Sequence, residues 1–234
     1  MDYINDLIEN IGIAKGDIVS IIGSGGKTTL LRALSKTMAK DLKVAALTTT
    51  KIFYPKREDY TEVFVGLKKT PFHIDKPGVY YFANEYSGDK LSGLSMELYS
   101  EIKRTTDIMI IEADGSAGKP LKGWEEYEPV IVDATTITIG IIPITAIGQR
   151  IDNDTIHRLP LFLKLIDGQR GEVINRQHLV DIINHRDGLF KYAEGKRVLY
   201  ISQADHEAAR LMAEDIIPEV KEDINKIMIG SIHL

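Results

Sequence analysis

The 234-residue chain contains no cysteine. Disulfide bonds are therefore excluded, and so are zinc–thiolate and iron–sulfur sites, because both need thiolate ligands. A chain without disulfides suits a reducing compartment, so we expect a cytoplasmic protein. Any bound metal should be a hard cation held by oxygen ligands, or a cation bound by some of the six histidines.

Long apolar runs and an excess of basic charge are also missing. No stretch approaches the ~20 apolar residues that a membrane-spanning helix needs, so we expect no membrane association. The net charge of -5 at pH 7 disfavours a nucleic-acid-binding surface. With 44% hydrophobic and 27% charged residues, the chain has ample material for a buried core.

Short β-branched runs alternate with longer segments of helical spacing along the chain. This alternation predicts an α/β fold with a mostly parallel sheet in a three-layer sandwich. We expect one domain, 1–234, in which the weakly patterned segment 52–95 is an insertion or an antiparallel flank. Strands are expected at 17–23, 43–50, 62–66, 78–86, 107–114, 135–144, 196–205 and 226–232, and helices at 27–40, 96–104, 153–167, 175–193 and 206–222.

The stretch "DIVSIIGSGGKTTLLRAL" (17–34) resembles a phosphate-binding loop between a strand and a helix. The standard loop reads G-x-x-x-x-G-K-[ST], but Ile21 stands where its first glycine would fall, and the nearest earlier glycine is Gly23. The loop is thus two residues short, although strand, glycines, Lys-Thr pair and helix keep their order. The residues predicted to bind a nucleoside triphosphate here are Gly23, Ser24, Gly25, Gly26, Lys27, Thr28 and Thr29.

The chemistry of this loop survives the shortening. Glycines can adopt positive φ and let amides approach a phosphate, and a helix N-terminus adds unpaired N–H groups. We expect Lys27 to reach the terminal phosphates and the Thr28 hydroxyl to bind Mg²⁺. The alternative is a glycine turn with a solvated lysine, which the helix dipole disfavours because a cation opposes it.

The strand "DIMIIEAD" (107–114) ends in two carboxylates, Glu112 and Asp114, which share a face in an extended chain. Phosphate-loop enzymes hold Mg²⁺ with an acid at the end of a neighbouring strand. We expect Glu112 in the metal shell and Asp114 on the metal or on the attacking water, and the reverse assignment stays open. The alternative is that both carboxylates only end the strand and solvate its turn.

Two further strand ends carry candidate residues. In "TTTK" (48–51), Thr49 or Thr50 can touch the γ-phosphate or the metal, or simply reflect the strand preference of threonine. In "YISQAD" (200–205), Asp205 half-matches the Asn-Lys-x-Asp segment with which many GTPases read guanine, and it can equally cap the helix that follows. The choice between GTP and ATP stays open.

Together, "IIGSGGKTTLL", "TTTKI", "IIEADGSAGKPLKGWEEYEPVI", "AIGQRIDNDTIHR" and "ISQAD" resemble the YqeC-type family of selenium-dependent hydroxylase accessory proteins. The resemblance implies a P-loop NTPase-like fold, nucleotide and Mg²⁺ binding, and assistance in the maturation of molybdenum hydroxylases. The resemblance assigns phosphate binding to residues 25–28 and the acidic end of the neighbouring strand to Glu112 and Asp114. The chain departs from the family at "SQAD", where asparagine is more common at the first position.

The sequence therefore predicts a Mg²⁺-dependent NTP-binding protein and NTPase, with Lys27, Asp114 and Thr50 as catalytic residues. The family resemblance implies that its partner is a molybdenum hydroxylase or a protein that matures the cofactor of such an enzyme. One alternative is a small-molecule kinase or ligase, with 52–95 and Arg150 or Arg158 as walls of the acceptor pocket. The other is a non-catalytic module that senses the nucleotide state.

Overall fold

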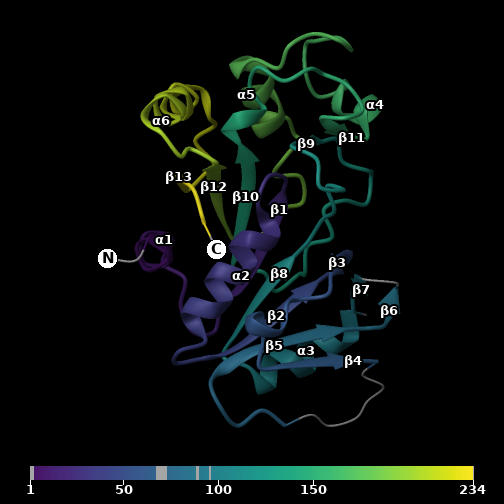
Figure 1. Ribbon diagram of the computed structural model, residues 1–234, viewed down its shortest axis with the longest axis vertical. Coiled ribbons are helices and arrows are strands. Elements are labelled where there is room, and N and C mark those ends of the chain that lie inside the picture. The colour runs from purple at the N-terminus through teal and green to yellow at the C-terminus, as the bar shows by residue number, and fades with distance from the viewer. Residues whose placement is uncertain (1–2, 67–72, 88–89, 95, 234) are drawn as a thin grey trace.

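A computed structural model describes residues 3–66, 73–87, 90–94 and 96–233. Its centre is an eight-stranded sheet in the order β13-β12-β10-β1-β8-β2-β5-β4, and every pairing in it is parallel (Figure 1). The strands are β1 (Ile18–Gly23), β2 (Lys43–Thr48), β4 (Glu62–Val65), β5 (Gly78–Ala83), β8 (Ile108–Glu112), β10 (Ile137–Pro143), β12 (Lys196–Ser202) and β13 (Lys226–Ile229).

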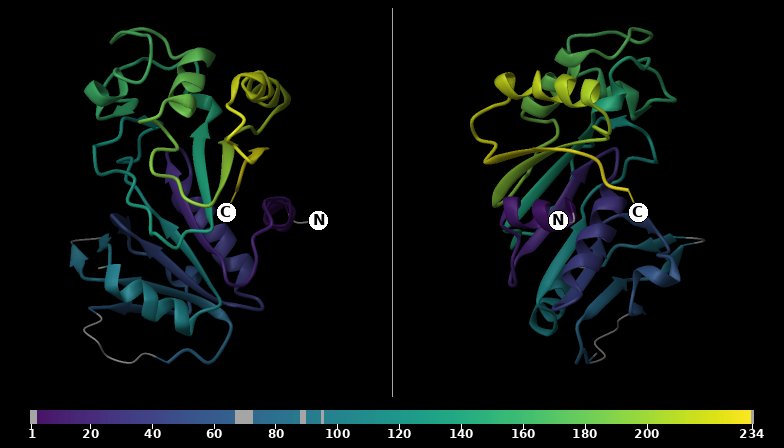
Figure 2. Two further views of the ribbon diagram at one scale, coloured as in Figure 1. Left: turned by 180° about the vertical axis from the view of Figure 1, so that it is seen from behind. Right: turned by 60° about the vertical axis from the view of Figure 1, so that its left-hand side comes forward.

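Helices cover both faces of this sheet (Figures 1 and 2). They are α1 (Tyr3–Ile11), α2 (Lys27–Met38), α3 (Met96–Thr105), α4 (Leu159–Phe162), α5 (Arg176–Asn184) and α6 (Glu207–Glu214), with 3-10 turns η1 (Arg57–Asp59), η2 (Ile144–Ala146) and η3 (Ile217–Glu219). Alternate strand residues point to opposite faces, so Val19 and Ile21 of β1 pack with α1 and α2 while Ile22 packs with α5 and α6. On the second face, α3 covers the part of the sheet formed by β2, β5 and β8.

This arrangement confirms the predicted α/β sandwich with its parallel sheet, although three of the expected helices are wrong or too long. Residues 153–167 form a two-residue strand, β11 (Ile156–His157), and a single turn, α4, because Arg158 takes a left-handed φ of 58° between them. The helix expected at 175–193 ends at Asn184. The one expected at 206–222 ends at Glu214, shortly before the η3 turn that contains a proline.

The segment that follows β2 contributes to two sheets. Strands β4 and β5 extend the main sheet, whereas β3 (Lys51–Phe53), β6 (Tyr86–Ser87) and β7 (Lys90–Ser92) form a small antiparallel sheet in the order β3-β7-β6. A third pair joins β9 (Leu121–Lys122) to β11. Within the described residues, no helix is long and apolar enough to cross a membrane.

Candidate functional site

The glycine loop joins the end of β1 to the start of α2 in a left-handed backbone. Gly23, Gly25 and Gly26 have φ values of 94°, 77° and 135°, as the sequence predicts for a loop that presents its amides. A Cβ on Gly23 would lie 2.2 Å from the carbonyl oxygen of Ile141, and one on Gly25 would lie 2.5 Å from Pro143. Neighbouring strand β10 therefore leaves no room for side chains at these two positions.

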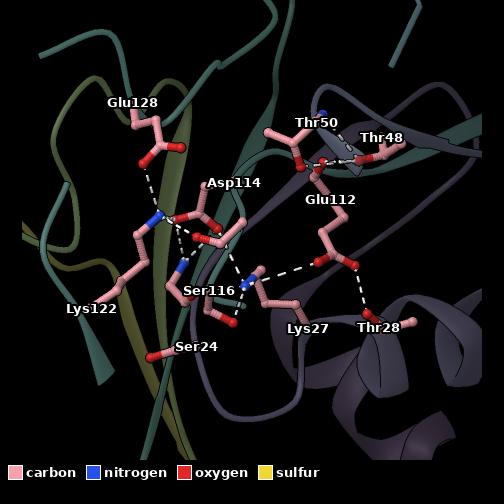
Figure 3. Close-up of polar contacts among 12 residues, drawn as sticks. Ser24, Lys27, Thr28, Thr48, Thr50, Glu112, Asp114, Ser116, Lys122 and Glu128 are labelled. Carbon is pink, nitrogen blue, oxygen red and sulfur yellow. Dashed lines mark hydrogen bonds and ion pairs between the residues drawn. The ribbon is translucent and has the colours of Figure 1, made fainter. Parts of the chain in front are cut away.

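Lys27, the first residue of α2, is only 4% exposed and reaches back over this loop (Figure 3). Its Nζ donates to the carbonyl oxygen of Gly23 at 2.6 Å and to Ser116 Oγ at 3.4 Å. Two carboxylates balance the ammonium charge, Asp114 at 3.4 Å and Glu112 at 3.9 Å. The structure thus brings the predicted lysine and both predicted acids to one point.

Thr28 and Glu112 meet beside this lysine. The Thr28 hydroxyl donates to Glu112 Oε2 at 2.7 Å, which joins the start of α2 to the end of β8 (Figure 3). Burial raises the pKa of Glu112, while Lys27 and Thr28 oppose that shift by stabilising the charged form. A hydroxyl and a carboxylate in contact are the two protein ligands that phosphate-loop proteins offer to Mg²⁺. No group of three or more His, Cys, Asp or Glu residues within the described chain could hold a metal ion by itself.

Asp114 has a different setting from Glu112, because it is 0% exposed and is not among the residues that line the cavity described below. Figure 3 shows its carboxylate between Lys27 and Lys122. Both of its oxygens accept from the Gly23 amide at 3.1 Å. Oδ2 also accepts from Trp124 Nε1 at 3.0 Å and from Lys122 Nζ at 3.2 Å. This carboxylate therefore fastens the glycine loop to the residues that follow β8.

A chain of buried charges continues from Asp114. Lys122 is 0% exposed, and its Nζ also contacts Glu128 Oε2 at 3.0 Å and the carbonyl oxygen of Gly115 at 2.6 Å. Glu128 accepts from both terminal nitrogens of Arg158. Burial alone would raise the pKa of Glu128, but Arg158 and Lys122 outweigh it and lower that pKa. The sequence signals this network only through Lys122, on the two-residue strand β9, and Trp124, two residues after it.

A cavity of about 750 Å³ opens at the loop and the start of α2. It is lined by Gly25, Gly26, Lys27, Thr28, Thr29, Lys51, Phe53, Lys90, Glu112, Gly115, Ser116, Ala117, Gly118, Lys119, Pro120, Thr145, Gln149 and Gln203. Five of the residues predicted to bind nucleotide are therefore on its wall, together with Glu112. Sequence reasoning placed Lys51 at this edge only as part of the "TTTK" strand end, and it missed Phe53 and Lys90, which meet through the pairing of two strands far apart in the chain.

Four other predicted residues, Gly23, Ser24, Asp114 and Thr50, are not among the residues that line this cavity. Ser24 is 3% exposed and donates from Oγ to the carbonyl oxygen of Pro120 at 2.7 Å. The Thr50 amide donates to Thr48 Oγ1 at 3.1 Å (Figure 3). These contacts hold the loop and the end of β2 in place, although Ser24 and Thr50 do not line the cavity themselves.

Asp205 lies outside the cavity wall and pairs with His233 at 2.7 Å. A hydrogen bond from Ser231 and the neighbouring histidines lower its pKa. It does not cap α6, because the N-cap is His206, whose side chain accepts from the Ala209 amide. Ser202 and Gln203, the first two residues of "SQAD", contact the glycine loop instead, since both donate to the carbonyl oxygen of Gly25.

The profile of the YqeC protein family matches residues 19–160, a span that holds both the glycine loop and the carboxylate strand. This chain belongs to the YqeC protein family. The family membership confirms the resemblance on which the sequence interpretation rests. This YqeC family member is 28% identical over 236 residues to an uncharacterized YqeC protein of Escherichia coli (strain K12), across 97% of this chain and 92% of the relative. No solved structure matches the chain.

Proposed function

We propose that this YqeC family member binds a magnesium-bound nucleoside triphosphate, GTP or ATP, and hydrolyses it. One observation carries the proposal: the Thr28 hydroxyl and the Glu112 carboxylate lie 2.7 Å apart beside the buried Lys27, on the wall of a 750 Å³ cavity. A hydroxyl, a carboxylate and an ammonium group in contact at a glycine-rich helix start match the chemistry that holds metal-bound polyphosphate.

In this proposal, Thr28 Oγ1 and Glu112 are the residues that hold Mg²⁺. Both supply oxygen atoms, which this cation prefers, and they already lie within hydrogen-bonding distance of each other. Bound Mg²⁺ would neutralise charge on the β- and γ-phosphate oxygens. The buried Glu112 has a raised pKa, so a metal cation on its carboxylate offsets the cost of keeping that charge away from water.

Lys27 serves the terminal phosphate. Its Nζ contacts the carbonyl oxygen of Gly23 and two carboxylates, so the side chain is held in place at the loop before any nucleotide arrives. The amides of Gly26 and the first residues of α2 have no partners within the helix, so they are available to an anion that binds at the helix start. Pre-arranged donors of this kind stabilise the charge that develops as the γ-phosphoryl group leaves.

The structure supports different roles for the other two predicted catalytic residues. Asp114 is enclosed by four protein groups, so we assign it the positioning of the loop rather than contact with metal or water. Thr50 follows the end of β2, where Thr48 Oγ1 accepts from its amide and donates to the carbonyl oxygen of Glu112. It remains our candidate for a residue that responds to the γ-phosphate. The proposed accessory role toward molybdenum hydroxylases rests on the family resemblance.

Thermal unfolding with GTP, ATP and non-hydrolysable analogues, with and without Mg²⁺, tests this function. A nucleotide present at ~100 times its dissociation constant stabilises the folded state by about 2.7 kcal/mol. We expect Lys27→Ala to weaken binding at least about tenfold, because it removes a charged hydrogen-bond donor. Glu112→Gln should bind equally with and without Mg²⁺. Lys40→Ala is the matched control, since Lys40 is exposed just beyond the other end of the same helix. Unchanged nucleotide affinity in Lys27→Ala contradicts the proposal.

A further inference from the structure

The cavity has a second wall that the phosphate loop does not supply. Lys51 and Phe53 of β3 and Lys90 of β7 line the same cavity as Lys27 and Thr28. In the antiparallel pairing Phe53 lies directly opposite Lys90. Directly opposed residues share a face of a sheet, and so do residues two apart on one strand. The three side chains therefore form one face, which we call the β3–β7 wall.

The composition of the β3–β7 wall points to a ligand rather than to packing. Phe53 is 62% exposed, and Lys90 Nζ lies 4.5 Å from the centroid of its ring. The other face of the small sheet does the packing, since Leu91, which alternates with Lys90, is 1% exposed. An exposed aromatic ring with one ammonium group against it, and a second lysine on the same face, offers a surface for a planar ring and charge for an anion.

The charge of the whole cavity agrees with this reading. Its wall carries four lysines, Lys27, Lys51, Lys90 and Lys119, against one carboxylate, Glu112, although the chain as a whole has a net charge of -5. A cavity with locally concentrated positive charge attracts anions. Lys27 and Glu112 face each other at the phosphate loop, whereas Lys51 and Lys90 stand on a separate sheet.

We propose that the β3–β7 wall is a second binding subsite, which takes a small anionic compound with a planar ring, such as an aromatic phosphate or carboxylate, while nucleotide occupies the phosphate loop. The simultaneous occupancy rests on the proposed function. The subsite itself rests on the residues of the wall. The alternative occupant of the β3–β7 wall is the base or the γ-phosphate of the nucleotide itself. The titration described next distinguishes this alternative from a second ligand.

Calorimetric titration with phenyl phosphate tests the subsite in two settings. The first is wild-type protein saturated with a non-hydrolysable Mg²⁺–nucleotide analogue, in which the phosphate loop is filled. The second is Lys27→Ala without nucleotide, in which the loop has lost its lysine. We expect phenyl phosphate to bind in both, and tighter than inorganic phosphate. If wild-type protein binds no nucleotide, the proposed function fails, and the Lys27→Ala titration still decides the question of the subsite.

Variants then assign the binding to the wall. In either setting, Lys51→Ala/Lys90→Ala should weaken phenyl phosphate at least about tenfold, because it removes both ammonium groups. Phe53→Ala should weaken phenyl phosphate about three- to tenfold and leave inorganic phosphate unaffected. Lys40→Ala controls for the loss of an exposed lysine away from the cavity. Wild-type affinity in the double lysine variant overturns the proposal. So does displacement of phenyl phosphate by the nucleotide analogue in wild-type protein, which would assign the wall to the nucleotide.

Discussion

Replacing Lys122 with methionine probes the buried charges behind the loop most directly. The side chain is 0% exposed, and methionine keeps its approximate length while removing the ammonium group. Asp114 at 3.2 Å, Glu128 at 3.0 Å and the carbonyl oxygen of Gly115 at 2.6 Å would each lose a partner. Removing one member of a buried ion pair typically costs 3–5 kcal/mol, because the remaining charge is left uncompensated.

The expected loss for Lys122→Met lies at the lower end of that range, about 3 kcal/mol. Asp114 keeps its contact with Lys27, and Glu128 keeps its contact with Arg158, so neither carboxylate is left without a cation. Urea denaturation measures the change as a lower transition midpoint with an unchanged slope. Lys40→Met, at an exposed lysine, controls for the substitution itself and should change stability by less than about 0.5 kcal/mol. A Lys122→Met loss below about 1 kcal/mol would refute the reasoning, since the ammonium group would then contribute no more than an exposed ion pair.

Two further predictions concern acid stability and the loop. Asp59 is 2% exposed and paired with Arg32 and Lys36; burial would raise its pKa, but the two cations outweigh burial and lower it. The ionised Asp59 carboxylate therefore stabilises the fold above its unfolded pKa of about 4, and this stabilisation is lost as the pH falls through the lower folded pKa. Asp59→Asn should consequently lose less stability than wild type between neutral and acidic pH, as measured by denaturation at each pH. Gly25→Ala should destabilise the protein by about 1–3 kcal/mol more than Gly148→Ala in urea denaturation, because both have positive φ but only Gly25 lies against a proline ring. Equal losses would show that the clash is relieved by small shifts.

The parallel sheet was predictable because its strands are buried on both faces. Every residue of the runs 18–22 and 108–111 is buried, and all of them except Ser20 are apolar, which is the pattern of a central parallel strand. The helices of the 153–193 region were harder to predict, because their apolar residues enter the core from loops. Leu189 is buried at 1% exposure, yet it lies beyond the end of α5, where His185 takes an extended ψ of 135° and the Leu189 amide donates to the carbonyl oxygen of Ile182.

Local order allowed part of the site to be predicted. Lys27, Thr28 and Glu112 each sit at the end of a recognisable strand or at the start of a helix, and parallel strands bring such ends to one edge. The β3–β7 wall has no comparable signal, because its faces are set by the pairing of Phe53 with Lys90 across 36 intervening residues. Alternation within a three-residue strand is too short to predict a register.

The two carboxylates of the "EAD" segment look equivalent in sequence, but the fold separates their roles. Glu112 is the last residue of β8 and contacts Thr28 on the cavity side. Asp114, two residues later, turns to the Gly23 amide, where a loop two residues shorter than the standard form needs an anchor of its own. An acceptor held by Lys122 and Trp124 can fix that amide, while the Ser24 amide donates to the carbonyl oxygen of Ile141 and the Gly26 amide at the start of α2 has no partner within the helix. The compressed loop is thus consistent with phosphate binding because a buried carboxylate supports it from behind.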